Sequence, residues 1–235
     1  MKKTLLGLAV LTGLGIQPGI AAAAAALAPS IRASVNGDAI DIGLTQDQNA
    51  PNKYDFNVVN SSYEIHGSLV AIFDPQLSYS IGLTNLLSST TTFAFIFSMP
   101  YVGGPYGNAY SSHSGSFTDG GNGSVTISPP SAYIHQPLLD GTPFGPIVGG
   151  CSFSGGAFTS GPCGAGTILG IPILSLASGT LEIDVAANVS GNDLYSLNGL
   201  AGIDDEPVPE PLTLAIFGMG LAGAVVLRRR RGRAA

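Results

Sequence analysis

Apolar and polar side chains alternate with a period of two along much of the chain between residues 28 and 205. The longest run covers residues 63–73, and the next, residues 77–83, alternates with serines and a glycine. The same period recurs at Ile40, Ile42 and Leu44, at Tyr54, Phe56 and Val58, at Phe93, Phe95, Phe97 and Met99, at Val125 and Ile127, and at Leu181, Ile183 and Val185. Such alternation is typical of half-buried β-strands.

No stretch of this region has the 3.6-residue period of an amphipathic helix. Seven or eight short strands without helical crossovers predict an all-β fold, an antiparallel β-sandwich with jelly-roll-like connections as one option. Residues 100–123 and 129–166 are rich in Gly, Ser and Pro, and we expect them to form long loops. Loops of that length are usually either functional or disordered, so a ligand surface is expected there first.

Charge is scarce and unevenly placed. Charged residues make up 10% of the chain. Between residues 27 and 206 there are fourteen acidic side chains but only two basic ones, Arg32 and Lys53, which gives a formal charge of −12 for this region. Nucleic-acid affinity comes mainly from Lys and Arg contacts to phosphates. The sequence therefore argues against a nucleic-acid partner.

The N-terminus has the three parts of a secretory signal peptide in order. Lys2 and Lys3 precede a 12-residue apolar stretch, residues 5–16, and an alanine run follows at residues 21–26. Twelve residues fall short of the ~20 that a membrane-spanning helix needs. We expect a signal helix over residues 1–26 that signal peptidase removes after export across the inner membrane.

The C-terminus combines a short motif, an apolar stretch and a basic cluster. Pro209, Glu210 and Pro211 precede residues 212–227, in which Thr213 is the only polar residue. Sixteen helical residues span ~24 Å, and flanking arginines reach the headgroups and make up part of the ~30 Å thickness. The four arginines that stop the span are Arg228, Arg229, Arg230 and Arg231. Arginine clusters stay on the cytoplasmic side, so this transmembrane helix is expected to leave the preceding domain outside.

This order of motif, span and arginines, over residues 207–233, resembles the PEP-CTERM family of sorting signals. The resemblance implies cleavage near Pro209, Glu210 and Pro211 by exosortase, a membrane-embedded transpeptidase. An ordinary C-terminal anchor with a chance Pro-Glu-Pro is the alternative. The expected organisation is a signal peptide (1–26), an extracytoplasmic β-sandwich domain (27–190), a polar linker (191–206) and the sorting tail (207–233). The protein would be anchored transiently in the membrane and then reach the cell surface or the extracellular space.

Two cysteines, Cys151 and Cys163, lie twelve positions apart. An even number of cysteines in an exported protein predicts a disulfide. A metal pair is the alternative, although no other ligand residues lie nearby.

The chain lacks the usual sequence signatures of catalysis and metal binding. There is no G-x-S-x-G nucleophile elbow, and the three histidines form no zinc motif. We therefore assign no catalytic residue, no metal ligand and no cofactor, although calcium at Asp38 and Asp41, or at residues 204–206, is an option. Three tyrosines in a Gly-rich stretch are candidates for stacking on sugar rings: Tyr101, Tyr106 and Tyr110.

These observations favour a non-catalytic structural or adhesive protein of the cell surface or extracellular matrix, associated with exopolysaccharide or biofilm. A carbohydrate-binding module is the first alternative, and an exported hydrolase is the second. Processing by signal peptidase and exosortase is expected in each case.

Overall fold

The computed structural model describes residues 28–72, 75–147, 149–173 and 176–205. The expected signal peptide, the Pro-Glu-Pro motif, the apolar stretch and the arginine cluster lie outside the described residues. Among the described residues, no helix reaches the length and apolar content needed to cross a membrane.

The described part of the chain folds into strands. In chain order they are β1 (Ser30–Val35), β2 (Asp38–Ile40), β3 (Thr45–Gln46), β4 (Lys53–Val59), β5 (Tyr63–Ile72), β6 (Gln76–Asn85), β7 (Thr91–Tyr101), β8 (Tyr106–Thr118), β9 (Ser124–Ser128), β10 (His135–Leu139), β11 (Thr142–Pro143), β12 (Cys151–Ser154), β13 (Ser160–Pro172), β14 (Gly179–Val189) and β15 (Leu194–Asp205).

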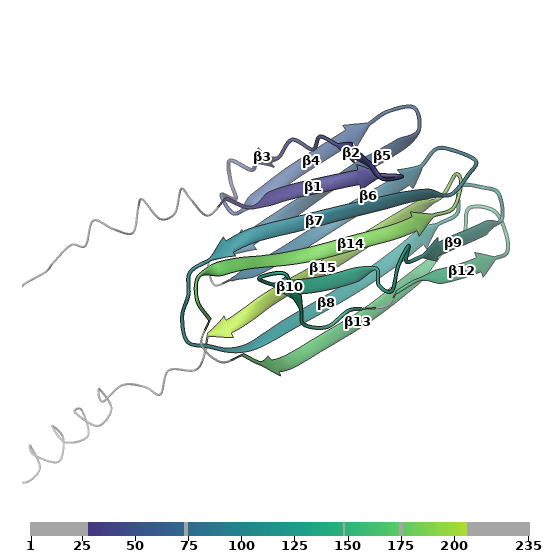
Figure 1. The fold of residues 1–235 in the computed structure, drawn as a ribbon. Helices are drawn as coiled ribbons and strands as arrows, with labels where there is room; N and C mark the ends of the chain where they lie inside the picture. Colours follow the sequence, from purple (N-terminus) through teal and green to yellow (C-terminus); the bar gives the residue numbers. More distant parts are fainter. Residues whose placement is uncertain (1–27, 73–74, 148, 174–175, 206–235) are drawn as a thin grey trace, which may run out of the picture.

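The strands form two sheets that lie face to face (Figure 1). One sheet has the order β11-β10-β14-β7-β1-β2, and β9 joins it by pairing with β14 and β12. The second has the order β13-β8-β15-β6-β5-β4-β3. Strands that pair within the two sheets run antiparallel. The predicted all-β antiparallel fold is confirmed, and the two sheets are consistent with a sandwich.

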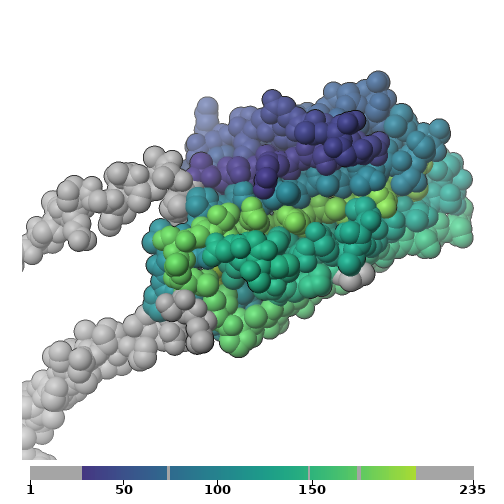
Figure 2. All heavy atoms as spheres, viewed as in Figure 1, coloured from purple at the N-terminus to yellow at the C-terminus, as the bar shows by residue number. Residues whose placement is uncertain are grey.

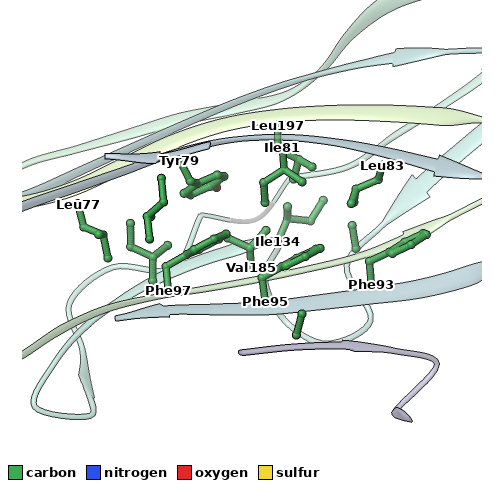
Figure 3. Packing of buried hydrophobic residues seen from close by; sticks show 14 of the residues in the cluster. Leu77, Tyr79, Ile81, Leu83, Phe93, Phe95, Phe97, Ile134, Val185 and Leu197 are labelled. Carbon is green, nitrogen blue, oxygen red and sulfur yellow. The ribbon is translucent and has the colours of Figure 1, made fainter. Parts of the chain in front are cut away.

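The core lies between the two sheets. Apolar side chains of β7 face those of β6 across the interior (Figure 3). The facing residues are Phe93, Phe95 and Phe97 on β7 and Leu77, Tyr79, Ile81 and Leu83 on β6, and all are at most 4% exposed. Burying one such side chain contributes about 1.5–3 kcal/mol, so the residues that alternate in the sequence are the ones that hold the sheets together.

Strands far apart in the chain become neighbours. In the eight-stranded sheet, β7 pairs with β1 on one side and with β14 on the other. Figure 2 shows the result on one face of the molecule, where the purple N-terminal segment lies along the teal-blue β7 and the green β14 follows on the other side of β7. These long-range pairings define the domain as one unit.

The structure differs from the sequence expectation in three segments. The expected loop at residues 100–123 is occupied mainly by β8, and the loop at 129–166 contains β10, β11, β12 and the start of β13. The inward positions of β8 include Ser111, His113 and Gly115, so hydrophobicity does not alternate there. Residues 191–206, expected as a polar linker, contain β15, which lies between β8 and β6 inside the second sheet.

Candidate functional site

A hollow of about 530 Å³ lies across four neighbouring strands of the seven-stranded sheet, β13, β8, β15 and β6. Two rows of residues that point away from the core border it. One row contains Ala165, Ser114 and Asn198, and the other contains Thr167, Ser112, Leu200 and Ser78. The rows combine hydroxyl, amide and small apolar groups, and they lie on the outer face because successive strand residues point to opposite faces.

Between these two rows runs a third row whose side chains face the core. It consists of Gly166, His113, Gly199 and Tyr79, paired side by side across the four strands. Gly199 is required for a close approach, since a Cβ atom there would lie 2.5 Å from the Tyr79 hydroxyl oxygen. The hollow therefore has a floor of backbone, above an interior that is filled by aromatic side chains.

Larger side chains flank the hollow on the same outer face. Tyr110 is two residues before Ser112 on β8, and its ring lies over Gly202 of β15, where an added Cβ would be 2.4 Å from the ring. On the other side, the His66 ring covers Gly82 of β6. Between these two rings the outward positions include the short side chains of Ser78, Ser112 and Ser114.

Beneath the hollow, three side chains from three strands share hydrogen bonds inside the core. The Tyr79 hydroxyl lies 2.8 Å from Nδ1 of His135 and 3.2 Å from Nδ1 of His113. The three side chains are at most 4% exposed. The rings also pack together, with centroids 5.7 Å apart for Tyr79 and His135 and 5.5 Å apart for the two histidines.

The chain of hydrogen bonds ends on backbone carbonyls. Nε2 of His135 lies 2.7 Å from the Ser111 hydroxyl, which donates to the carbonyl oxygen of Leu200 at 2.8 Å. At the other end, the Tyr195 hydroxyl lies 3.5 Å from Nε2 of His113 and 3.4 Å from the Cys163 carbonyl oxygen. Buried polar groups are costly unless they are paired, and among the described residues no buried side-chain nitrogen or oxygen lacks a partner.

The 2.8 Å hydrogen bond from Ser111 to the Leu200 carbonyl determines which atom donates in the adjoining hydrogen bonds. Ser111 has one hydroxyl proton, and the Leu200 carbonyl accepts it. His135 must then donate from Nε2 to Ser111 and accept at Nδ1 from Tyr79, and Tyr79 accepts in turn from His113 Nδ1. In this arrangement His135 is neutral, with Nε2 as donor and Nδ1 as acceptor, and His113 donates from Nδ1.

Burial keeps both histidines neutral. Desolvation lowers the pKa of His113 to about 4. Desolvation, followed by the repulsion that a protonated His113 would exert, lowers the pKa of His135 to about 3. Burial also raises the pKa of Tyr79 and Tyr195 above the ordinary tyrosine value. Neutral rings are what an interior of low dielectric constant favours.

Ser111 and His135 form a serine–histidine contact, but its geometry is unlike that of a nucleophilic pair. A catalytic serine donates its proton to the histidine that acts as its base, whereas Ser111 donates to a backbone carbonyl. Both side chains are at most 1% exposed and lie inside the sandwich. Among the described residues, no group of three His, Cys, Asp or Glu side chains could hold a metal ion.

The tyrosines that the sequence suggested as sugar contacts have different positions. Tyr101 and Tyr106 are 3% and 8% exposed, and their rings pack edge to face in the core with centroids 6.1 Å apart. The Tyr101 hydroxyl donates to Asp140 at 2.9 Å, and burial, followed by this bond, raises its pKa. Tyr110, which is half-buried on the outer face of β8, is the member of the three beside the hollow.

The disulfide expected between Cys151 and Cys163 is confirmed. It joins β12, which belongs to the eight-stranded sheet, to β13 at the edge of the seven-stranded sheet. The bond therefore links the two layers next to the hollow instead of closing an irregular loop.

A buried carboxylate organises the loops at one end of the sandwich. Asp119 accepts hydrogen bonds from the backbone N–H groups of Gly121, Asn122, Gly123 and Phe158 at 3.0–3.2 Å. Burial opposes ionisation of Asp119, but these four donors outweigh it and hold its pKa below the ordinary value. Its oxygens are satisfied by the chain itself, so this acidic position is structural.

The sequence did not single out Ser112, Ser114, Thr167 or Asn198, which line the hollow. The available signal was the repetition of serine at every second position, at 112, 114 and 116. A serine at every second position also has the period of a β-strand, although the pattern of hydrophobic residues does not reveal this strand.

A family model described as the PEP-CTERM protein-sorting motif matches residues 207–231. The resemblance of the C-terminal tail to this family is thereby confirmed. The motif indicates an exported protein that is sorted to the cell surface or the extracellular space through transient membrane anchoring. No curated protein matches the chain.

Two solved structures are similar to the chain at low identity. The structure of TmCBM61 in complex with β-1,4-galactotriose has 8% sequence identity and a TM-score of 0.32, covering 75% of this chain and 88% of its own. The adhesin domain of Epf from Streptococcus pyogenes has 12% identity and a TM-score of 0.28, covering 74% of this chain and 57% of its own. At these scores neither likeness carries a functional argument.

Proposed function

We propose that this protein is a non-catalytic structural or adhesive component of the cell surface or extracellular matrix, delivered by exosortase and associated with exopolysaccharide or biofilm. The observation that carries the proposal is the sorting motif at residues 207–231 behind an acidic β domain. Signal peptidase and exosortase are the processing partners that this proposal requires.

The geometry of the core supports a role without catalysis. The serine–histidine contact, Ser111 with His135, is inaccessible from solvent and has the wrong proton direction for a nucleophile. A hydrolase would need a reactive pair at a surface that substrate can reach. The hollow on the outer face offers hydroxyl and amide groups, which suit binding more than bond cleavage.

The sorting step is tested by replacing Pro209, Glu210 and Pro211 with alanine in the native host. We expect a precursor that keeps its tail and stays in the membrane fraction, as measured by intact mass and fractionation. Asp204→Ala, shortly before the motif, is the matched control and should be processed normally. An unchanged mature C-terminus and unchanged release in the triple variant would show that sorting does not use this motif.

The matrix role is tested separately in a strain that makes no exopolysaccharide. The processed protein should be retained with wild-type cells and their matrix but appear in the medium of the polysaccharide-deficient strain. Equal retention by both strains would exclude association with exopolysaccharide.

A carbohydrate-binding module is the second candidate, and the hollow is the observation that favours it. This function and the matrix role are compatible, since a glycan-binding domain would hold the processed protein in a polysaccharide matrix.

A further inference from the structure

We propose that the hollow on the outer face of the seven-stranded sheet is a binding site for a neutral polysaccharide chain. The inference deepens the proposed function by naming the site and the chemical class of ligand. It rests on the proposed function only for the location, the cell surface or extracellular matrix, in which the protein encounters this ligand. It rests on the polar groups of the hollow, on its lack of charge and on its dimensions.

The lining supplies polar groups that the fold does not use. Ser78, Ser112, Ser114, Thr167 and Asn198 line the hollow, and none of these five side chains forms a hydrogen bond within the part of the chain that the structure describes. Hydroxyl and amide groups both donate and accept, as the hydroxyls of a sugar do. On the inner face of the same strand, by contrast, Ser111 is fully engaged.

The same lining also offers small apolar surface. Leu200 lies in the row with Ser112, and Ala165 lies in the row with Ser114. Binding sites for small molecules combine apolar area with a few convergent polar groups. The C–H faces of a sugar ring can pack on the apolar area, and its hydroxyls can form hydrogen bonds with the polar groups.

The absence of charged side chains in the hollow favours a neutral polysaccharide over an anionic one. None of the eleven residues that line the hollow is Lys, Arg, Asp or Glu, and the histidine among them, His113, is turned into the core and neutral. A uronate, sulfate or phosphate group would find no cation there to pair with. The strongly negative region between residues 27 and 206 would also repel a polyanion.

The dimensions suit an extended chain that crosses the strands. Four strands at the usual spacing of about 4.8 Å span about 14 Å, and outward rows two residues apart are separated by about 7 Å. A groove of this shape accepts a few sugar rings in a line. Tyr110 lies beside the row that contains Ser112 and Leu200, where its ring extends the apolar surface.

The floor is held in position before any ligand binds. Its residues belong to paired strands, and two of them, Tyr79 and His113, are fixed by hydrogen bonds on the inner side. A site on rigid strands loses less conformational entropy on binding than a site on loops.

The test is affinity electrophoresis of the full chain in mild detergent, with the gel containing dextran, galactomannan or a β-glucan as neutral probes and alginate as the anionic probe. We expect retardation by at least one neutral polysaccharide and none by alginate. Ser114→Tyr fills the hollow and should weaken binding by about tenfold or more, which corresponds to a loss of about 1.4 kcal/mol. Tyr110→Ala should weaken it less.

Thr118→Tyr is the matched control, because Thr118 lies on the same face of β8, outside the hollow. It should bind as the wild type does, and circular dichroism should show that both tyrosine variants are folded. No retardation by any of the neutral probes, retardation by alginate alone, or unchanged binding in folded Ser114→Tyr would each overturn the proposal. None of these results would affect the sorting of the protein, which the Pro-Glu-Pro variant tests independently.

Discussion

Acidification from pH 7.5 to pH 5 is expected to destabilise the fold through its two buried histidines. In the folded protein the pKa values of His113 and His135 are about 4 and about 3, against an ordinary value of 6.5. Below pH 6.5 the unfolded chain binds a proton at each imidazole, while the folded chain does not. The contribution of the two neutral histidines to the free energy of unfolding is therefore fully present above pH 6.5. It is lost as the pH falls from 6.5 towards their pKa values in the folded protein.

The size of the effect follows from the difference between the two states. One pH unit corresponds to about 1.36 kcal/mol for each group that is protonated in the unfolded state alone. From pH 6.5 to pH 5 the loss is about 2 kcal/mol for each histidine and about 4 kcal/mol for both. Domains are usually stable by only about 5–15 kcal/mol, so the unfolding midpoint should move clearly.

The pKa values of two buried or half-buried carboxylates shift in opposite directions. Four backbone donors, outweighing burial, lower the pKa of Asp119, so its contribution is lost only at more acidic pH. Burial and then the charge of Glu182 raise the pKa of Asp184, which therefore adds some stability as the pH falls. The histidines set the sign of the trend between pH 7.5 and pH 5.

The assay is urea unfolding followed by circular dichroism at half-unit pH steps, with His135→Gln as the comparison. This variant loses hydrogen bonds and should be less stable at every pH, but its stability should change with pH by only about half as much. The slope is the informative quantity, since lost packing alone does not alter it. A wild-type free energy of unfolding that stays flat over this range would refute the burial of two neutral imidazoles.

Two further predictions concern the disulfide and a crowded glycine. Cys151→Ser together with Cys163→Ser should lower the free energy of unfolding by about 3 kcal/mol, the chain-entropy contribution of so short a loop, and reducing agent should lower the urea midpoint of the wild type but not of the variant. Gly199→Ala should cost about 1–3 kcal/mol, because the new Cβ would lie 2.5 Å from the Tyr79 hydroxyl. Both glycine variants are measured by the same urea unfolding. Gly43→Ala, with no atom within 4 Å of its Cβ, should be nearly neutral, and equal losses for the two alanine variants would contradict the crowding at Gly199.

Period-two hydrophobicity predicts the strands whose inward side chains are large and apolar. It locates β4, β5, β6, β7 and β14, whose buried residues include Phe56, Ile65, Ile81, Phe95 and Ile183. These strands depend on burial of apolar area, which a single sequence displays directly. The all-β class follows from them alone.

The same signal misses β8 and β13, because several of their inward positions are small or polar. On β8 the core-facing residues include Ala109, Ser111 and His113, and their burial depends on partners from distant strands. A hydrogen-bond network of this kind depends on tertiary contacts. The candidate site lies on these strands, which explains why sequence patterns pointed to loops instead.

The hollow and the buried network share a common structural cause. Tyr79 and His113 point inwards from the row between the two hydroxylated rows, and glycines at 166 and 199 complete that row. Glycine at 199 makes room for a polar aromatic side chain beneath the sheet and leaves the backbone above it uncovered. Protonation of His113 would disturb the row that forms the floor of the hollow. Ligand binding in the hollow and stability at acidic pH should therefore be linked. A ligand that binds only the folded state must raise the free energy of unfolding at pH 5.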